Sequence, residues 1–117
     1  KQKKFYDTVL KAKKNAEKTF ERGICSRKLD EVAREIIQKE LKMEFIHSLG
    51  HGVGIDVHET PSIGPSSENK LIKGNVFTIE PGVYEFNYGG VRLEDTYVIT
   101  SDNSLESLNK FPFQFEI

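Results

Sequence analysis

The sequence holds a single cysteine, Cys25, and no long apolar run. One thiol cannot form an internal disulfide, which is typical of a protein in a reducing compartment. No apolar stretch approaches the roughly 20 residues that a membrane-spanning helix needs, and the lysine-rich amino terminus is not a signal peptide. These absences predict a cytoplasmic protein with no membrane partner.

An excess of either charge is also missing. Seventeen basic residues face eighteen acidic ones, for a formal net charge of −1, so nothing points to nucleic acid as a partner. Lysines crowd the first 18 residues, but apolar residues interleave with them at helical spacing, which favours a solvated helix face over a nucleic-acid arm. With 37% hydrophobic and 30% charged residues in 117, the chain fits one globular domain at most.

Two helices are predicted at about residues 2–22 and 27–42. Gly23 is expected to terminate the first, and Ser26 can cap the second. Each helix has one apolar face that must pack on something. These faces consist of Phe5, Val9, Ala12, Ala16 and Phe20 in the first helix, and Leu29, Val32, Ala33, Ile36, Ile37 and Leu41 in the second.

The remainder, about residues 45–117, has the composition of strands and turns. One strand is predicted from Val76 to Glu80, ending at Pro81-Gly82, a second from Val91 to Thr100, and a short last one over residues 112–116. Residues 60–75 have the chemistry of a loop. The order of elements predicts an α+β fold with both helices on one face of an antiparallel sheet.

All three histidines, His47, His51 and His58, lie within 12 consecutive residues. A zinc-protease helix is rejected because three glycines would each cost a helix about 1 kcal/mol and no His-Glu-x-x-His pattern is present. In an extended chain His47 and His51 share a face and His58 lies on the other, unless a glycine bulge turns it back. Three surface histidines beside a turn remain the alternative, and their clustering weighs against it.

Two glutamates occupy strand positions in the second half. Glu80 ends an apolar strand on the same face as Thr78, and Glu94 shares a strand face with Arg92. Each segment alone fits an exposed edge residue or a salt bridge as well as it fits a ligand. Together, one histidine and two glutamates suit manganese, cobalt or zinc. Two such ions about 3.5–4 Å apart would polarise a carbonyl and activate water.

These motifs resemble a known family. The run His47–Glu59 is similar to the whole proline-peptidase signature, and Ile79–Tyr84 and Gly90–Thr96 look like the two glutamate motifs of the same enzymes. The resemblance covers essentially the whole chain and points to the "pita-bread" metallopeptidases, in particular Xaa-Pro dipeptidases (prolidases) and Xaa-Pro aminopeptidases. It implies a metal-dependent exopeptidase that cleaves the Xaa-Pro bond at the amino terminus of dipeptides or peptides.

The resemblance also implies a ligand set for two divalent ions, with manganese or cobalt favoured and zinc possible. His51 and Glu80 would bind one ion, and Glu94 would bridge both. Family members take two further ligands from aspartates in an earlier β-hairpin, which no aspartate of this sequence matches. The chain is therefore expected to be the carboxy-terminal half of the fold, without its amino-terminal half, and to be inactive alone.

The remaining roles implied by the resemblance are catalytic. His47 would line the site near the substrate's proline, and His58 would stabilise charge on the scissile carbonyl. Glu80 would accept the proton of the attacking water, while Arg92 and Tyr84 would orient ligand and substrate. The intact enzyme is expected to be a homodimer.

Two other functions are compatible with the same fold. One is a non-catalytic homologue that acts as a binding protein, and the other is a metal-free, creatinase-like hydrolase that uses the corresponding histidine as a base. Retention of His51, Glu80 and Glu94 together speaks against both.

Overall fold

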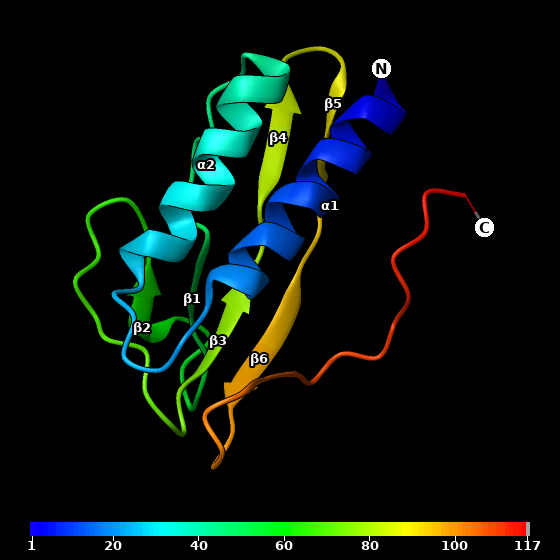
Figure 1. Ribbon diagram of the computed structural model, residues 1–117. Helices are drawn as coiled ribbons and strands as arrows, with labels where there is room; N and C mark the ends of the chain where they lie inside the picture. Colours follow the sequence, from blue (N-terminus) through cyan, green and yellow to red (C-terminus); the bar gives the residue numbers. More distant parts are fainter. Residues whose placement is uncertain (117) are drawn as a thin grey trace.

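The computed structural model describes residues 1–116, in which two helices cross one face of an antiparallel sheet (Figure 1). The helices are α1, Gln2–Thr19, and α2, Arg27–Leu41. The strands are β1 Gly50–Gly52, β2 Glu59–Ile63, β3 Val76–Ile79, β4 Gly82–Glu85, β5 Gly89–Arg92, β6 Asp95–Ile99 and β7 Leu105–Ser107. The α+β class expected from the sequence is confirmed. Ile117, at the end of the predicted strand region, lies outside the described residues.

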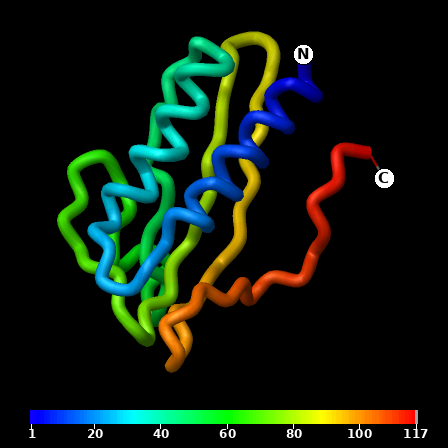
Figure 2. The backbone as a smooth tube through the Cα atoms, in the orientation of Figure 1, coloured from blue at the N-terminus to red at the C-terminus, as the bar shows by residue number. Residues whose placement is uncertain are grey.

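The strands form a five-stranded sheet, in the order β2-β1-β3-β6-β7, and a separate β4-β5 hairpin. β3 pairs with β6 from Val76↔Val98 to Ile79↔Asp95. The chain continues from β3 into β4, turns, and returns through β5 into β6, as the tube in Figure 2 shows. One long hairpin is thus interrupted on both arms, after Ile79 and after Arg92.

Two predicted strands need correction. The strand expected from Val91 to Thr100 is two strands, β5 and β6, with Leu93 and Glu94 between them. The strand expected over residues 112–116 is wrong: that segment has no ladder partner, and the last strand is β7, which pairs with β6. Phe115 of this segment packs instead on α1, where the rings of Tyr6 and Phe115 lie 5.5 Å apart.

The helix ends also differ in detail from the sequence expectation. α1 ends at Thr19, so Gly23, with a φ of +76°, belongs to the turn that follows and does not cap the helix. Ser26 occupies the N-cap position of α2, but its buried hydroxyl makes no capping hydrogen bond. Neither helix among residues 1–116 has the length and apolar character that crossing a membrane requires.

The core lies between the helices and the facing side of the sheet. Val9, Ala12, Leu29 and Ile37 from the predicted helical faces are fully buried. Each large side chain buried in this way stabilises the fold by about 1.5–3 kcal/mol. Phe77, Ile79, Val83 and Ile99 meet them from the sheet. Because the helix-facing side of the sheet is apolar, polar side chains of alternate strand positions gather on the other side.

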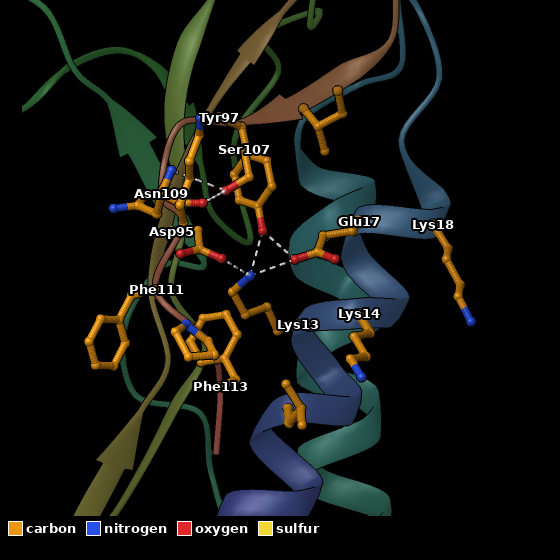
Figure 3. A pocket seen from close by; sticks show the side chains of 14 residues that line it. Lys13, Lys14, Glu17, Lys18, Asp95, Tyr97, Ser107, Asn109, Phe111 and Phe113 are labelled. Carbon is orange, nitrogen blue, oxygen red and sulfur yellow. Dashed lines mark hydrogen bonds and ion pairs between the residues drawn. The ribbon is translucent and has the colours of Figure 1, made fainter. Parts of the chain in front are cut away.

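One charged group is buried in the helix–sheet interface. Lys13 of α1 is 2% exposed, and its ammonium lies 2.8 Å from Asp95 Oδ2 and 2.5 Å from Glu17 Oε1 (Figure 3). It also contacts the Tyr97 hydroxyl, which donates to Glu17. Burial and the Glu17 carboxylate raise the pKa of Tyr97 far above its ordinary value, so the hydroxyl keeps its proton. The network ties α1 to β6.

Candidate functional site

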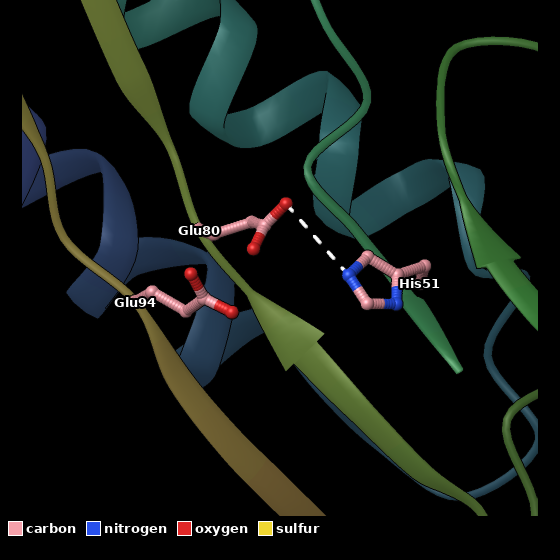
Figure 4. Close-up of side chains that lie close together, drawn as sticks. All are labelled: His51, Glu80 and Glu94. Atoms are coloured by element: carbon pink, nitrogen blue, oxygen red, sulfur yellow. Dashed lines mark ion pairs between the residues drawn. The ribbon is translucent and has the colours of Figure 1, made fainter. Parts of the chain in front are cut away.

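The three predicted metal ligands come from separate segments of the sheet region and lie together (Figure 4). His51 is in β1, Glu80 follows β3, and Glu94 precedes β6. One ligand atom from each lies within 4.8 Å of the others, and His51 Nε2 is 4.0 Å from Glu80 Oε1. Within residues 1–116 this is the one group of three or more His, Cys, Asp or Glu side chains with such spacing.

Close approach of β1 to β3 places His51 beside Glu80. A Cβ at Gly50 would lie 1.8 Å from the Thr78 carbonyl oxygen, so only glycine permits this distance. The His51 amide donates to Thr78 Oγ1 at 3.1 Å, and the Glu80 amide donates to the Leu49 carbonyl at 2.8 Å. These two hydrogen bonds fix the backbones of both candidate ligands.

The His51 imidazole is oriented for ligation. Its Nδ1 lies 2.9 Å from the Gly52 carbonyl oxygen. Because a carbonyl only accepts hydrogen bonds, Nδ1 carries the proton and Nε2 presents its lone pair towards Glu80. A proton fixed on the far nitrogen by a carbonyl is the usual arrangement of a metal-binding histidine.

The two glutamates influence each other electrostatically. Burial first, and then the hydrogen bond and negative charge of Glu94, raise the pKa of Glu80 to about 7, while His51 and Arg92 act in the opposite direction. The Arg92 Nε lies 3.8 Å from Glu94 Oε2, and both side chains are substantially exposed. Two carboxylates and one imidazole form a donor set that fits a divalent ion between manganese and zinc in character.

The loop between β1 and β2 brings the third histidine close to His51. The register between β1 and β2 shifts at His51/Gly52, and the ring centroids of His51 and His58 lie 4.2 Å apart. His58 is exposed at the rim. His58 therefore returns because residues 53–58 form a loop and not an extended strand, and the register shift leaves Thr60 and Pro61 of β2, not a glycine, as the additional residues.

His47 and Tyr84 form the other wall. His47 Nδ1 lies 2.8 Å from the Ser48 carbonyl oxygen, so Nε2 accepts the hydrogen bond from the Tyr84 hydroxyl, also at 2.8 Å. A hydrogen bond with Tyr84 raises the pKa of Arg92. An open pocket of about 430 Å³ is lined by His47, Ser48, Gly50, His51, His58, Ser62, Glu80 and Arg92. Five of the seven side chains expected from the sequence thus line this pocket, Tyr84 contacts His47 beside it, and Glu94 lies with His51 and Glu80.

Two site-supporting residues were missed by sequence reasoning. Asp30 of α2 is fully buried and pairs with Arg34, and both contact the segment that carries His47. Asp30 stands among the apolar face residues Leu29 and Ala33. A carboxylate on the core face of a helix was the signal available, because such a group is buried only when it has partners.

Comparison with known proteins places these features in a family. Residues 1–101 match the model of metallopeptidase family M24. The chain is 47% identical over 111 residues to a protein of Pyrococcus furiosus named Xaa-Pro dipeptidase, covering 94% of this chain and 32% of that protein. The chain therefore spans about a third of the length of this relative.

Solved structures give the same result. A prolidase from Pyrococcus furiosus superposes with a TM-score of 0.88 at 46% identity, covering 95% of this chain and 33% of that one. An X-prolyl aminopeptidase from Caenorhabditis elegans, described as a cytosolic enzyme with a di-nuclear active site, gives 0.81 at 33% identity, covering 95% and 20%. These structures confirm the fold class, and with the match over residues 1–101 they show that the chain belongs to metallopeptidase family M24.

Proposed function

We propose that the protein containing this chain is a metal-dependent exopeptidase that hydrolyses the bond between an amino-terminal residue and proline. The observation that carries the proposal is the convergence of His51, Glu80 and Glu94 in a member of a metallopeptidase family. Relatives named Xaa-Pro dipeptidase and X-prolyl aminopeptidase support proline-containing dipeptides or peptides as the substrate class.

The donor set supports two divalent ions, as in the di-nuclear relative. His51 Nε2 and Glu80 would hold one ion, and Glu94 would hold both. When bound, the ions would polarise the scissile carbonyl and ease deprotonation of the attacking water. We propose that the remaining ligands come from residues outside this sequence, in an amino-terminal half of the same fold. Manganese or cobalt fits the donors best, and zinc is compatible.

Glu80 and the neighbouring His58 would have separate roles in the reaction. Glu80, held next to His51, would accept the proton of the attacking water and return it to the leaving amine. His58, exposed at the rim, can donate a hydrogen bond to the scissile carbonyl oxygen as negative charge develops there.

Substrate orientation would fall to the wall of the pocket. His47, fixed by its hydrogen bond to Tyr84, would face the proline ring of the substrate. Arg92 lies beside Glu94 and would keep that carboxylate directed at the metal site.

The proposal is tested on the intact protein. Hydrolysis of an Xaa-Pro dipeptide should require a divalent metal, disappear after chelation and return with manganese, while a matched dipeptide without proline should be a poor substrate. Metal analysis should find two ions per protein. Full activity after chelation would point to the metal-free hydrolase, and metal binding without hydrolysis would point to a binding protein.

A further inference from the structure

A bidentate ion pair lies beneath the histidine segment on α2. Arg34 Nε is 2.9 Å from Asp30 Oδ2, and Arg34 Nη2 is 3.1 Å from Asp30 Oδ1. Asp30 has no exposed side-chain surface, while the Arg34 side chain is 30% exposed. A planar guanidinium held by two parallel contacts has a fixed direction, so its remaining N–H groups point to defined positions.

Those positions are backbone carbonyls of the segment between α2 and β1. Residues 42–49 belong to no helix or strand, so no ladder satisfies their backbone groups. Arg34 donates to the His47 carbonyl at 3.0 Å and to the Phe45 carbonyl, and Asp30 Oδ1 accepts the Leu49 amide at 3.0 Å. One ion pair therefore binds three backbone groups within five residues.

Side-chain packing continues this contact to His47. The Arg34 guanidinium lies 4.7 Å from the centre of the Phe45 ring, and the ring centroids of Phe45 and His47 are 4.7 Å apart in an edge contact. Phe45 is 2% exposed. The His47 ring is thus held between this buried ring and Tyr84.

Two of the three candidate metal ligands have other supports, and the third, Glu80, directly follows β3 although its amide is bound to the Leu49 carbonyl. His51 is a member of β1 and pairs with Ser62, and its amide is bound by Thr78. Glu94 stands at the start of β6, on the far side of β3 from β1. Loss of the α2 pair should therefore disturb His47 more than it disturbs metal binding.

We propose that Asp30 and Arg34 are positioning residues that hold the backbone of residues 45–49, and with it the His47 imidazole, at the wall of the substrate pocket. The consequence for turnover rests on the proposed function. The consequence for the placement of His47 does not, because it follows from the contacts alone.

The experiment uses the intact protein with Arg34→Gln and Arg34→Lys. The lysine variant keeps the charge partner of the buried Asp30 but cannot reach both carbonyls, so it remains informative if the glutamine variant fails to fold. Arg27→Gln is the matched control, because Arg27 forms an exposed pair with Glu31 on the same helix.

We expect both Arg34 variants to speed hydrogen exchange at the Leu49 amide and to shift the imidazole NMR signals of His47, with those of His51 unchanged. Manganese affinity should stay within about threefold, whereas kcat/KM for an Xaa-Pro dipeptide should fall roughly 10- to 100-fold, as a displaced substrate-positioning group predicts. Adding either substitution to His47→Ala should cause little further loss, because both remove the same contribution.

Other outcomes separate the two proposals. An unchanged His47 signal and Leu49 exchange rate in the lysine variant would overturn the positioning role, whatever the activity. Equal losses of metal affinity and turnover, or additivity with His47→Ala, would show that the pair only stabilises the fold. A shifted His47 signal in a protein that hydrolyses no Xaa-Pro bond would retain the positioning role and reject the proposed function.

Discussion

Glu94 and Glu59 have the same side chain but different surroundings. A carboxylate oxygen of Glu94 lies with the ligand atoms of His51 and Glu80. The Glu59 carboxylate instead accepts the Asp56 amide at 3.2 Å, a local contact within the loop before β2. In the intact protein we expect Glu94→Ala to lower kcat/KM by roughly 100-fold or more, because a lost ligand changes both charge and geometry. Glu59→Ala should cost much less. Equal, mild losses would indicate that Glu94 serves only as the ion-pair partner of Arg92.

Glu80 gives a prediction on pH and stability without metal. Its pKa of about 7 exceeds the ordinary value of 4.5, so the folded state holds this proton more tightly than the unfolded state does. The resulting stabilisation is complete below pH 4.5 and is lost as pH rises through 7. The metal-free Glu80→Gln variant should therefore be more stable than wild type at pH 8, by about 1 kcal/mol after solvent screening, and similar at pH 4.5.

Urea unfolding in the presence of a chelator measures this difference. In the intact protein without chelator, manganese should reverse the order at pH 8, because it stabilises the form that binds it more tightly. A variant that is destabilised equally at both pH values would contradict the assignment.

At the scale of elements, the interrupted hairpin decides where the glutamates point. Pro81 has no N–H to donate, and its carbonyl accepts the Leu93 amide at 3.2 Å across the interruption. Glu80 and Glu94 lie next to these two residues, on opposite arms. The sequence indicated the first interruption through Pro81. It did not indicate the second, because Val91–Thr100 alternates without a break. The ladder between β3 and β6 ends at the pair Ile79↔Asp95 because β3 itself ends there.

The buried Lys13 network gives a prediction about how α1 is attached to the sheet. Lys13→Met removes the positive charge and leaves the carboxylates of Asp95 and Glu17 without their shared partner. Breaking a buried pair from one side should lower the free energy of unfolding by about 3 kcal/mol or more. Lys14→Met, at the neighbouring exposed position, should change it by no more than about 0.5 kcal/mol. Similar denaturation midpoints for the two variants would show that the network adds little stability.

At the scale of the whole molecule, the chain spans about a third of the Pyrococcus furiosus relative. Under the proposed function these 117 residues supply His51, Glu80 and Glu94, and only Glu94 reaches the second ion. We therefore expect the chain alone to bind manganese weakly and to leave an Xaa-Pro dipeptide uncleaved. Calorimetry and a hydrolysis assay test this directly. Near-normal turnover that Glu80→Ala abolishes would show that this part is sufficient and that the proposed ligand set is incomplete.

Elements whose signals are local could be predicted from the order of the residues. Apolar spacing of 3.6 residues identified the buried faces of both helices, and strand parity placed Arg92 and Glu94 on one side of the chain with Leu93 and Asp95 on the other. The motif residues identified the family, because their order and spacing are properties of the sequence itself.

Features that depend on partners distant in sequence became visible in the folded chain. His58 returns to His51 because β2 pairs antiparallel with β1 and His58 directly precedes β2. The sheet takes its last strand from Leu105–Ser107 because those residues meet β6. Asp30 acquires its role only when α2 lies beside the segment before β1. Hydrogen bonds of this kind are set by which backbones pack together, and a pattern read along one chain does not contain that information.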